Sequence, residues 1–150
     1  MILVDSCGWL EAIKGAGLAA SYAPALAQPD EVLVPTVCLL EVARVMCRER
    51  GEQAAADAIA AMTLGTVVPL DVTLAASAAF LGERTALPCA DSVIYATAQA
   101  HGAEVWTHDE HFRGLPGVHF VEAPRGTERC VRTSDTLSSL RRPAQIEERS

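Results

Sequence analysis

The sequence predicts an α/β fold in which a mostly parallel sheet carries helices on both faces. Short runs rich in Val, Ile and Leu alternate with longer stretches of helical periodicity, which is typical of such sheets. The chain has 150 residues, of which 50% are hydrophobic and 21% charged, so it can bury one core and is not wholly disordered. The five predicted strands are Ile2–Val4, Val32–Val34, Thr66–Leu70, Glu104–Thr107 and Val118–Val121.

Two helices are predicted between the first and second strands. Asp5 or Ser6 is placed to cap the first of them, because a short polar side chain accepts hydrogen bonds from the N–H groups of a first turn. This helix is expected to end near Gly15. The second covers Leu18–Ala27 and is shortened or strained by Pro24.

The remaining helices are predicted from apolar spacing and from the residues at their ends. Thr36 is expected to cap a helix that ends before Gly51, and Asp71 or Thr73 to open a later one. The predicted segments are Thr36–Arg50, Glu52–Leu64, Asp71 or Thr73 to about Arg84, Cys89–His101, and a short helix from His108 or Asp109 to just before Gly114.

The chain is expected to divide near Pro124 into a folded domain, residues 1–124, and an Arg- and Ser-rich tail, residues 125–150. The tail has few apolar residues, so we expect it to be flexible. Of the net charge of −7, the tail carries +2 and residues 1–124 carry −9. A domain with this negative charge is expected to bind nucleic acid poorly unless local basic patches, metal ions or the tail supply positive charge.

The cysteines and the apolar runs indicate a cytoplasmic protein. The five cysteines are odd in number and lack the paired spacing of a disulfide framework or a zinc site, so we expect buried, reduced thiols. No apolar run reaches the ~18 residues of a membrane-spanning helix. The first residues are expected to form a strand and not a signal peptide.

Four carboxylates are predicted to lie near one edge of the sheet. Asp5 and Asp109 follow the first and fourth strands, Glu41 lies in the helix after the second, and Asp91 lies in the first turn of the helix before the fourth. Doubly wound sheets keep their sites at the carboxyl ends of strands, where the strand order reverses. Taken singly, Asp5 and Asp109 are equally explained as helix caps, Asp91 as favourable first-turn charge, and Glu41 as a solvent-exposed side chain.

Together, the four carboxylates indicate a metal site. Closely spaced like charges raise one another's pKa values or recruit a cation. Carboxylate oxygens without histidine or cysteine partners suit Mg²⁺ or Mn²⁺. Such ions polarise phosphoryl oxygens and activate water, so the pattern favours hydrolysis of a phosphodiester.

Four sequence segments resemble the PIN domain family, in particular the VapC-type toxin ribonucleases of bacterial toxin–antitoxin pairs. The resemblance covers residues 1 to about 122, and its most specific part is the T-x-D-x-x-F pattern within Val105–Phe112. It implies a five-stranded parallel sheet of order 3-2-1-4-5. The segments are Val4-Asp5-Ser6, Leu40-Glu41-Val42, Ala90-Asp91-Ser92 and Val105–Phe112.

The resemblance implies a role for each matching residue. Asp5, Glu41, Asp91 and Asp109 match the acidic quartet that binds Mg²⁺ or Mn²⁺ and activates water. Ser6 and Thr107 match hydroxyls that orient the flanking acids or hold metal-bound water, and Phe112 matches a packing residue. An endoribonuclease that leaves a 5′-phosphate and a 3′-hydroxyl is then expected, as a homodimer inhibited by a small antitoxin protein.

A phosphate-binding patch is predicted beside the acids. Arg44 and Arg48 follow Glu41 on the same helix face, and they join Arg113 and Lys14 as candidates. The alternative is a solvated face with intrahelical ion pairs. A zinc site at His108-x-x-His111 is not expected, because no third ligand is evident.

Two other functions compete with the ribonuclease. A PIN-like module that binds RNA or protein without cutting usually lacks one or more of the acids, and all four are present here. A phosphotransfer or phosphatase domain on a similar sheet lacks its motif residues, since Lys14 is the only lysine and Cys7 stands where a second Asp is needed. For the ribonuclease, Asp5→Asn and Asp91→Asn are expected to abolish cutting and to leave the fold intact.

Overall fold

The computed structural model describes residues 1–122, so the predicted boundary at Pro124 and the predicted tail lie outside the described residues. One parallel sheet has the strand order β3-β2-β1-β4-β5, which confirms the order implied by the resemblance. Its third and fifth strands are shorter than predicted. The strands are β1 (Ile2–Val4), β2 (Val32–Pro35), β3 (Thr66–Val68), β4 (Glu104–Thr107) and β5 (Val118–Phe120).

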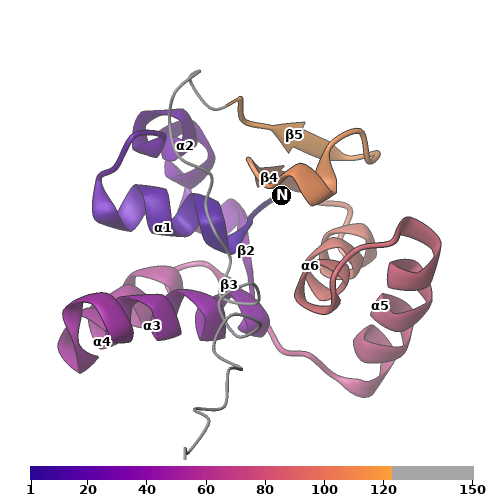
Figure 1. The fold of residues 1–150 in the computed structure, drawn as a ribbon, viewed down its shortest axis with the longest axis horizontal. Helices are drawn as coiled ribbons and strands as arrows, with labels where there is room; N and C mark the ends of the chain where they lie inside the picture. Colours follow the sequence, from indigo (N-terminus) through magenta and orange to yellow (C-terminus); the bar gives the residue numbers. More distant parts are fainter. Residues whose placement is uncertain (123–150) are drawn as a thin grey trace, which may run out of the picture.

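Helices cover both faces of the sheet, as predicted. In Figure 1, the helices that follow β1 and β2 lie on one side of the sheet, and the two that follow β3 lie on the other. The reversal of direction at β1 explains this division, because right-handed crossovers to opposite sides of one strand place their helices on opposite faces. The α-helices are α1 (Ser6–Lys14), α2 (Ala19–Leu26), α3 (Thr36–Arg50), α4 (Glu52–Met62), α5 (Val72–Thr85) and α6 (Cys89–Ala100).

Two short 3₁₀ turns complete the described chain. The turn η1 (Pro29–Glu31), before β2, was not predicted. The turn η2 (Glu110–Phe112), after β4, lies where a short helix was expected, and Asp109 caps it.

The predicted caps of α1 and α5 are confirmed, and the predicted cap of α3 is not. The Asp5 carboxylate accepts a hydrogen bond from the Ser6 amide at the start of α1, and Asp71 accepts one from the Leu74 amide in α5. Thr36 is not a cap, because α3 already begins with it. Its hydroxyl instead accepts a hydrogen bond from the Leu70 amide, which ties the loop after β3 to α3.

The core lies on both faces of the sheet, which is why its central strands are continuously apolar. All four residues of β2 are buried, and eight successive residues of α6, from Asp91 to Ala98, are buried as well. Helix α6 is therefore enclosed over two turns and carries a carboxylate into the interior.

The cysteines only partly follow the prediction. Cys7 and Cys38 are buried, but Cys47 and Cys89 are exposed, so the expectation of buried thiols was wrong for these two. Cys47 lies on the outer side of α3, and Cys89 is the first residue of α6, before that helix enters the core. None of these four forms a disulfide, and Cys130 lies outside the described residues. Among the described helices, none combines the length and the apolar character that crossing a membrane requires.

Candidate active site

The pairing of β1 with β4 brings Asp5 and Thr107 together at the carboxyl ends of the two strands. The Asp5 amide donates to the Trp106 carbonyl oxygen across 3.0 Å, which continues the ladder one residue past β1. The Thr107 hydroxyl donates to Oδ2 of Asp5 across 2.8 Å, and the Ser6 amide donates to Oδ1 across 2.7 Å. Both carboxylate oxygens of this fully buried aspartate are therefore held by donors.

Asp109 is held by the same threonine. Its amide donates to the Thr107 hydroxyl oxygen across 3.0 Å, and its Oδ1 accepts from the His111 amide across 2.9 Å. Thr107 thus connects Asp5 with the backbone of Asp109.

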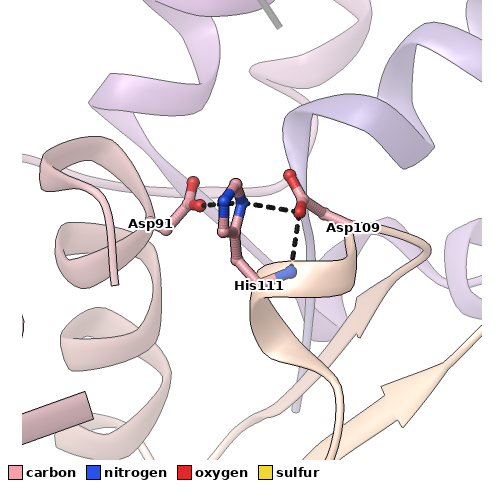
Figure 2. Close-up of side chains that lie close together, drawn as sticks. All are labelled: Asp91, Asp109 and His111. Carbon is pink, nitrogen blue, oxygen red and sulfur yellow. Dashed lines mark hydrogen bonds and ion pairs between the residues drawn. The ribbon is translucent and has the colours of Figure 1, made fainter. Parts of the chain in front are cut away.

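Asp91, Asp109 and His111 form a compact cluster (Figure 2). Nδ1 of His111 lies between the two carboxylates, 2.8 Å from Oδ1 of Asp109 and 3.3 Å from Oδ2 of Asp91. The Asp91 side chain has no solvent exposure, that of Asp109 is 13% exposed and that of His111 53% exposed. The cluster therefore runs from the core to the surface.

The donor set of this cluster fits a divalent cation. One ligand atom from each residue lies within 4.8 Å of the others. Ligands about 2.1 Å from a six-coordinate ion lie ~3 Å apart when they are adjacent, which is close to the spacings around Nδ1. Two carboxylate oxygens suit Mg²⁺ or Mn²⁺, and an imidazole nitrogen adds a donor that transition-metal ions accept more readily than Mg²⁺ does.

The structure brings two of the four predicted carboxylates into this cluster. Asp5 and Glu41 are not among its members. Asp5 is connected to it through Thr107, and half-buried Glu41 lies on α3, which packs against both α1 and α6. Their roles as metal ligands remain predictions.

The four basic residues predicted to bind phosphate have different environments. The Lys14 ammonium pairs with Glu49 across 2.6 Å, and the Arg113 guanidinium pairs with Glu110 and Glu122 across 2.7 and 2.9 Å. Arg44 and Arg48 are exposed on α3, and neither makes an ion pair within residues 1–122. The role of all four in binding phosphate stays a prediction.

The carboxylates beside Arg113 shift its titration and that of a partner. Hydrogen bonds to Glu110 and Glu122 raise the pKa of Arg113 above its ordinary value, and the bond from Arg113 holds the pKa of Glu122 below its ordinary value. The guanidinium also lies over the Phe120 ring, 3.9 Å from its centroid. The Arg113 guanidinium is thus already occupied by contacts with Glu110, Glu122 and Phe120.

Three residues near the acids were not singled out from the sequence as site residues. His111 was considered only as half of a zinc pair with His108, although its place two residues after Asp109 on a short turn was an available signal. The other two are Cys7, whose Sγ donates to Oδ2 of Asp5 across 3.3 Å, and Tyr22, which contacts His108. Nothing in the sequence near Tyr22 indicates that α2 approaches the site.

Comparison with known proteins identifies the family. The model of the PIN domain matches residues 2–118. The chain belongs to the PIN domain family. No curated protein is similar enough in sequence to match the chain.

Solved structures share the PIN fold with this chain. A toxin–antitoxin complex from Klebsiella pneumoniae is 22% identical and aligns with a TM-score of 0.68 over 81% of this chain and 100% of the solved one. VapC20 of Mycobacterium tuberculosis, described as a sarcin–ricin loop cleaving toxin, is 19% identical, with a TM-score of 0.61 over 75% and 92%. VapBC2 of Rickettsia felis, bound to a DNA fragment from its promoter, is 15% identical, with a TM-score of 0.62 over 83% and 100%.

Proposed function

We propose that this PIN-domain protein is a metal-dependent endoribonuclease and the toxin of a toxin–antitoxin pair. The observation that carries the proposal is the convergence of Asp91, Asp109 and His111 at the end of the sheet where Thr107 holds Asp5. The similar solved structures support it, because one is described as a toxin–antitoxin complex and another as a sarcin–ricin loop cleaving toxin.

In this proposal Asp91 and Asp109 hold Mg²⁺ or Mn²⁺, with Asp5 and Glu41 as the other predicted ligands. Such an ion would polarise a phosphoryl oxygen of RNA and lower the pKa of a water molecule. Thr107 and the Ser6 amide hold the Asp5 carboxylate in one orientation. The cap of η2 does the same for Asp109.

RNA binding requires local positive charge, because the described domain is acidic overall. We assign phosphate contacts to Arg44 and Arg48, which are exposed on the helix that carries Glu41. Arg113 and Lys14 already pair with glutamates, so they contribute less in this proposal. Binding through so few contacts is expected to weaken as salt rises.

The proposed partners are a small antitoxin protein and a second copy of this chain. The antitoxin is inferred from a similar solved structure that is described as a toxin–antitoxin complex. The homodimer is implied only by the resemblance to VapC-type toxins.

The test is cleavage of total cellular RNA by purified protein that is free of antitoxin. Reactions contain Mn²⁺ or Mg²⁺, an EDTA control and the Asp91→Asn variant, and the new 5′ ends are sequenced. Discrete ends that require both the metal ion and Asp91 are expected. Metal-independent ends, or ends that persist in Asp91→Asn, would contradict the proposed site. If folded protein bound Mn²⁺ but produced no new ends, the result would oppose RNA cleavage. If it bound no metal ion either, a non-cutting module would be favoured.

A further inference from the structure

A tyrosine from α2 reaches the loop that carries Asp109. Tyr22 is fully buried, and its hydroxyl shares a 2.7 Å hydrogen bond with Nδ1 of His108. The two rings lie 5.9 Å apart at 59°. Because His108 stands between Thr107 and Asp109 in the sequence, this bond ties the loop to α2, in addition to the contact of His111 with Asp91.

The same hydroxyl also reaches the β1–α1 segment. The Cys7 side chain lies close enough to this hydroxyl to raise the pKa of Tyr22, and its thiol donates to Oδ2 of Asp5. The contacts close a ring, because Thr107 accepts from the Asp109 amide and donates to that same Asp5 oxygen. Tyr22 is the member of this ring that lies outside both acid-bearing segments.

The phenol of Tyr22 stays protonated, because burial raises its pKa. Its hydroxyl can therefore donate to Nδ1 of His108 or accept from it, and the tautomer of the imidazole decides which. In either case the bond favours one tautomer of His108.

We propose that Tyr22 is a positioning residue that fixes the Asp109 loop through His108 and the Asp5 carboxylate through Cys7. Its effect on metal affinity rests on the proposed function, whereas its effect on the loop and on the His108 tautomer does not. Partners that orient ligands in this way typically change metal affinity by about 10- to 100-fold when they are removed.

Helix α1 carries a second sign that the tyrosine is held in one place. A Cβ added to Gly8 would lie 2.4 Å from Cε1 of Tyr22, so the ring rests directly on the helix backbone. The glycine next to Cys7 therefore lets the hydroxyl approach the thiol, which a side chain at this position would prevent.

The other tyrosine of the chain provides a matched control. Tyr95 is 2% exposed, and its hydroxyl donates to the Pro116 carbonyl oxygen across 2.7 Å. Its ring packs edge-on against Phe112, and Tyr95→Phe keeps that ring. Tyr22→Phe and Tyr95→Phe therefore remove the same group and a bond of the same length from equally buried rings. A merely structural tyrosine would behave alike at both positions.

The experiment compares wild type, Tyr22→Phe and Tyr95→Phe by three measurements. Hydrogen exchange of residues 107–112 without metal reports the loop, ¹⁵N NMR reports the His108 tautomer, and calorimetric titration reports Mn²⁺ affinity. We expect Tyr22→Phe alone to speed exchange roughly fivefold, to change the tautomer of His108, and to weaken Mn²⁺ binding about tenfold.

Either of two results would overturn the inference. One is a hydrogen-exchange rate of residues 107–112 and a His108 tautomer that are the same in Tyr22→Phe and in Tyr95→Phe. The other is an unchanged Mn²⁺ affinity in a protein that binds the ion. If wild-type protein neither bound Mn²⁺ nor cut RNA, the proposed function would fail. The hydrogen-exchange rates and the ¹⁵N spectrum of His108 would still decide whether Tyr22 positions the loop.

Discussion

The Thr107 hydroxyl donates its proton to Oδ2 of Asp5 across 2.8 Å, although the two residues are 102 positions apart in the sequence. The same oxygen accepts from the Cys7 thiol, and Oδ1 accepts from the Ser6 amide. Asp5 is therefore part of the structural framework as well as a candidate metal ligand, which changes what its substitution is expected to do.

Asp5→Asn is expected to lower the free energy of unfolding by about 1–3 kcal/mol, contrary to the expectation from sequence that it leaves the fold intact. An amide NH₂ would replace one of two oxygens that both face donors. Asp91→Asn is expected to cost less, because it removes a charge that lies near Asp109. Urea denaturation of both variants measures the difference, and equal stabilities would contradict this account.

Removing the His111 imidazole is expected to change metal preference. Its Nδ1 is the nitrogen donor of the cluster, and nitrogen favours Mn²⁺ over Mg²⁺. In His111→Ala we expect the ratio of Mn²⁺ to Mg²⁺ affinity, measured by calorimetry, to fall by about tenfold. The control is His119→Ala, since His119 stacks on Trp106 and is not in the cluster. A ratio that stays the same in His111→Ala would exclude the imidazole as a ligand.

Gly8→Ala is expected to destabilise the protein, although alanine is the better helix former by about 1 kcal/mol. The new Cβ would lie 2.4 Å from the Tyr22 ring, and overpacking of this kind costs about 1–3 kcal/mol. Thermal and urea unfolding measure the loss. In a Tyr22→Leu background the loss should shrink, because the contacting ring atoms are gone. An equal loss in both backgrounds would show that the clash is elsewhere.

RNA affinity is expected to depend more on Arg44 and Arg48 than on Arg113. Arg113 is already paired with two glutamates, whereas Arg44 and Arg48 make no ion pair within residues 1–122. Removal of one side chain that binds a phosphate should reduce the salt slope of RNA binding by about 1. Fluorescence anisotropy in the Asp91→Asn background, where RNA should not be cut, measures this. A larger effect of Arg113→Ala would reverse the assignment.

The ion pair between Arg113 and Glu122 is expected to be visible in the titration of Glu122. Arg113 lowers the pKa of this carboxyl in the folded protein. The contribution of the pair to stability is then complete above the pKa of glutamate in the unfolded chain and is lost as the pH falls through the lowered folded value. NMR titration of Arg113→Ala should return the pKa of Glu122 toward its ordinary value. No return would assign the shift to another cause.

The sequence alone determined the strand and helix pattern of this protein, because apolar periodicity and turn residues are local properties. The order of the strands followed from the resemblance to PIN domains, whereas the four acids were predicted from their places at or near the ends of the predicted strands. The prediction failed at Thr36, where a residue suited to a cap instead binds the Leu70 amide, a partner 34 residues away. The prediction that the cysteines are buried failed at Cys47 and Cys89, since exposure depends on how the helices pack.

Tertiary structure decided the details of the candidate site. His111 lies between Asp91 and Asp109 only because α6 and the turn after β4 meet at one edge of the sheet. Tyr22 reaches His108 across 86 residues only because Gly8 lets α2 approach α1 closely. Hydrogen bonds and metal ligation act over about 3 Å between side chains. Such contacts depend on packing between distant segments, which local sequence patterns do not specify.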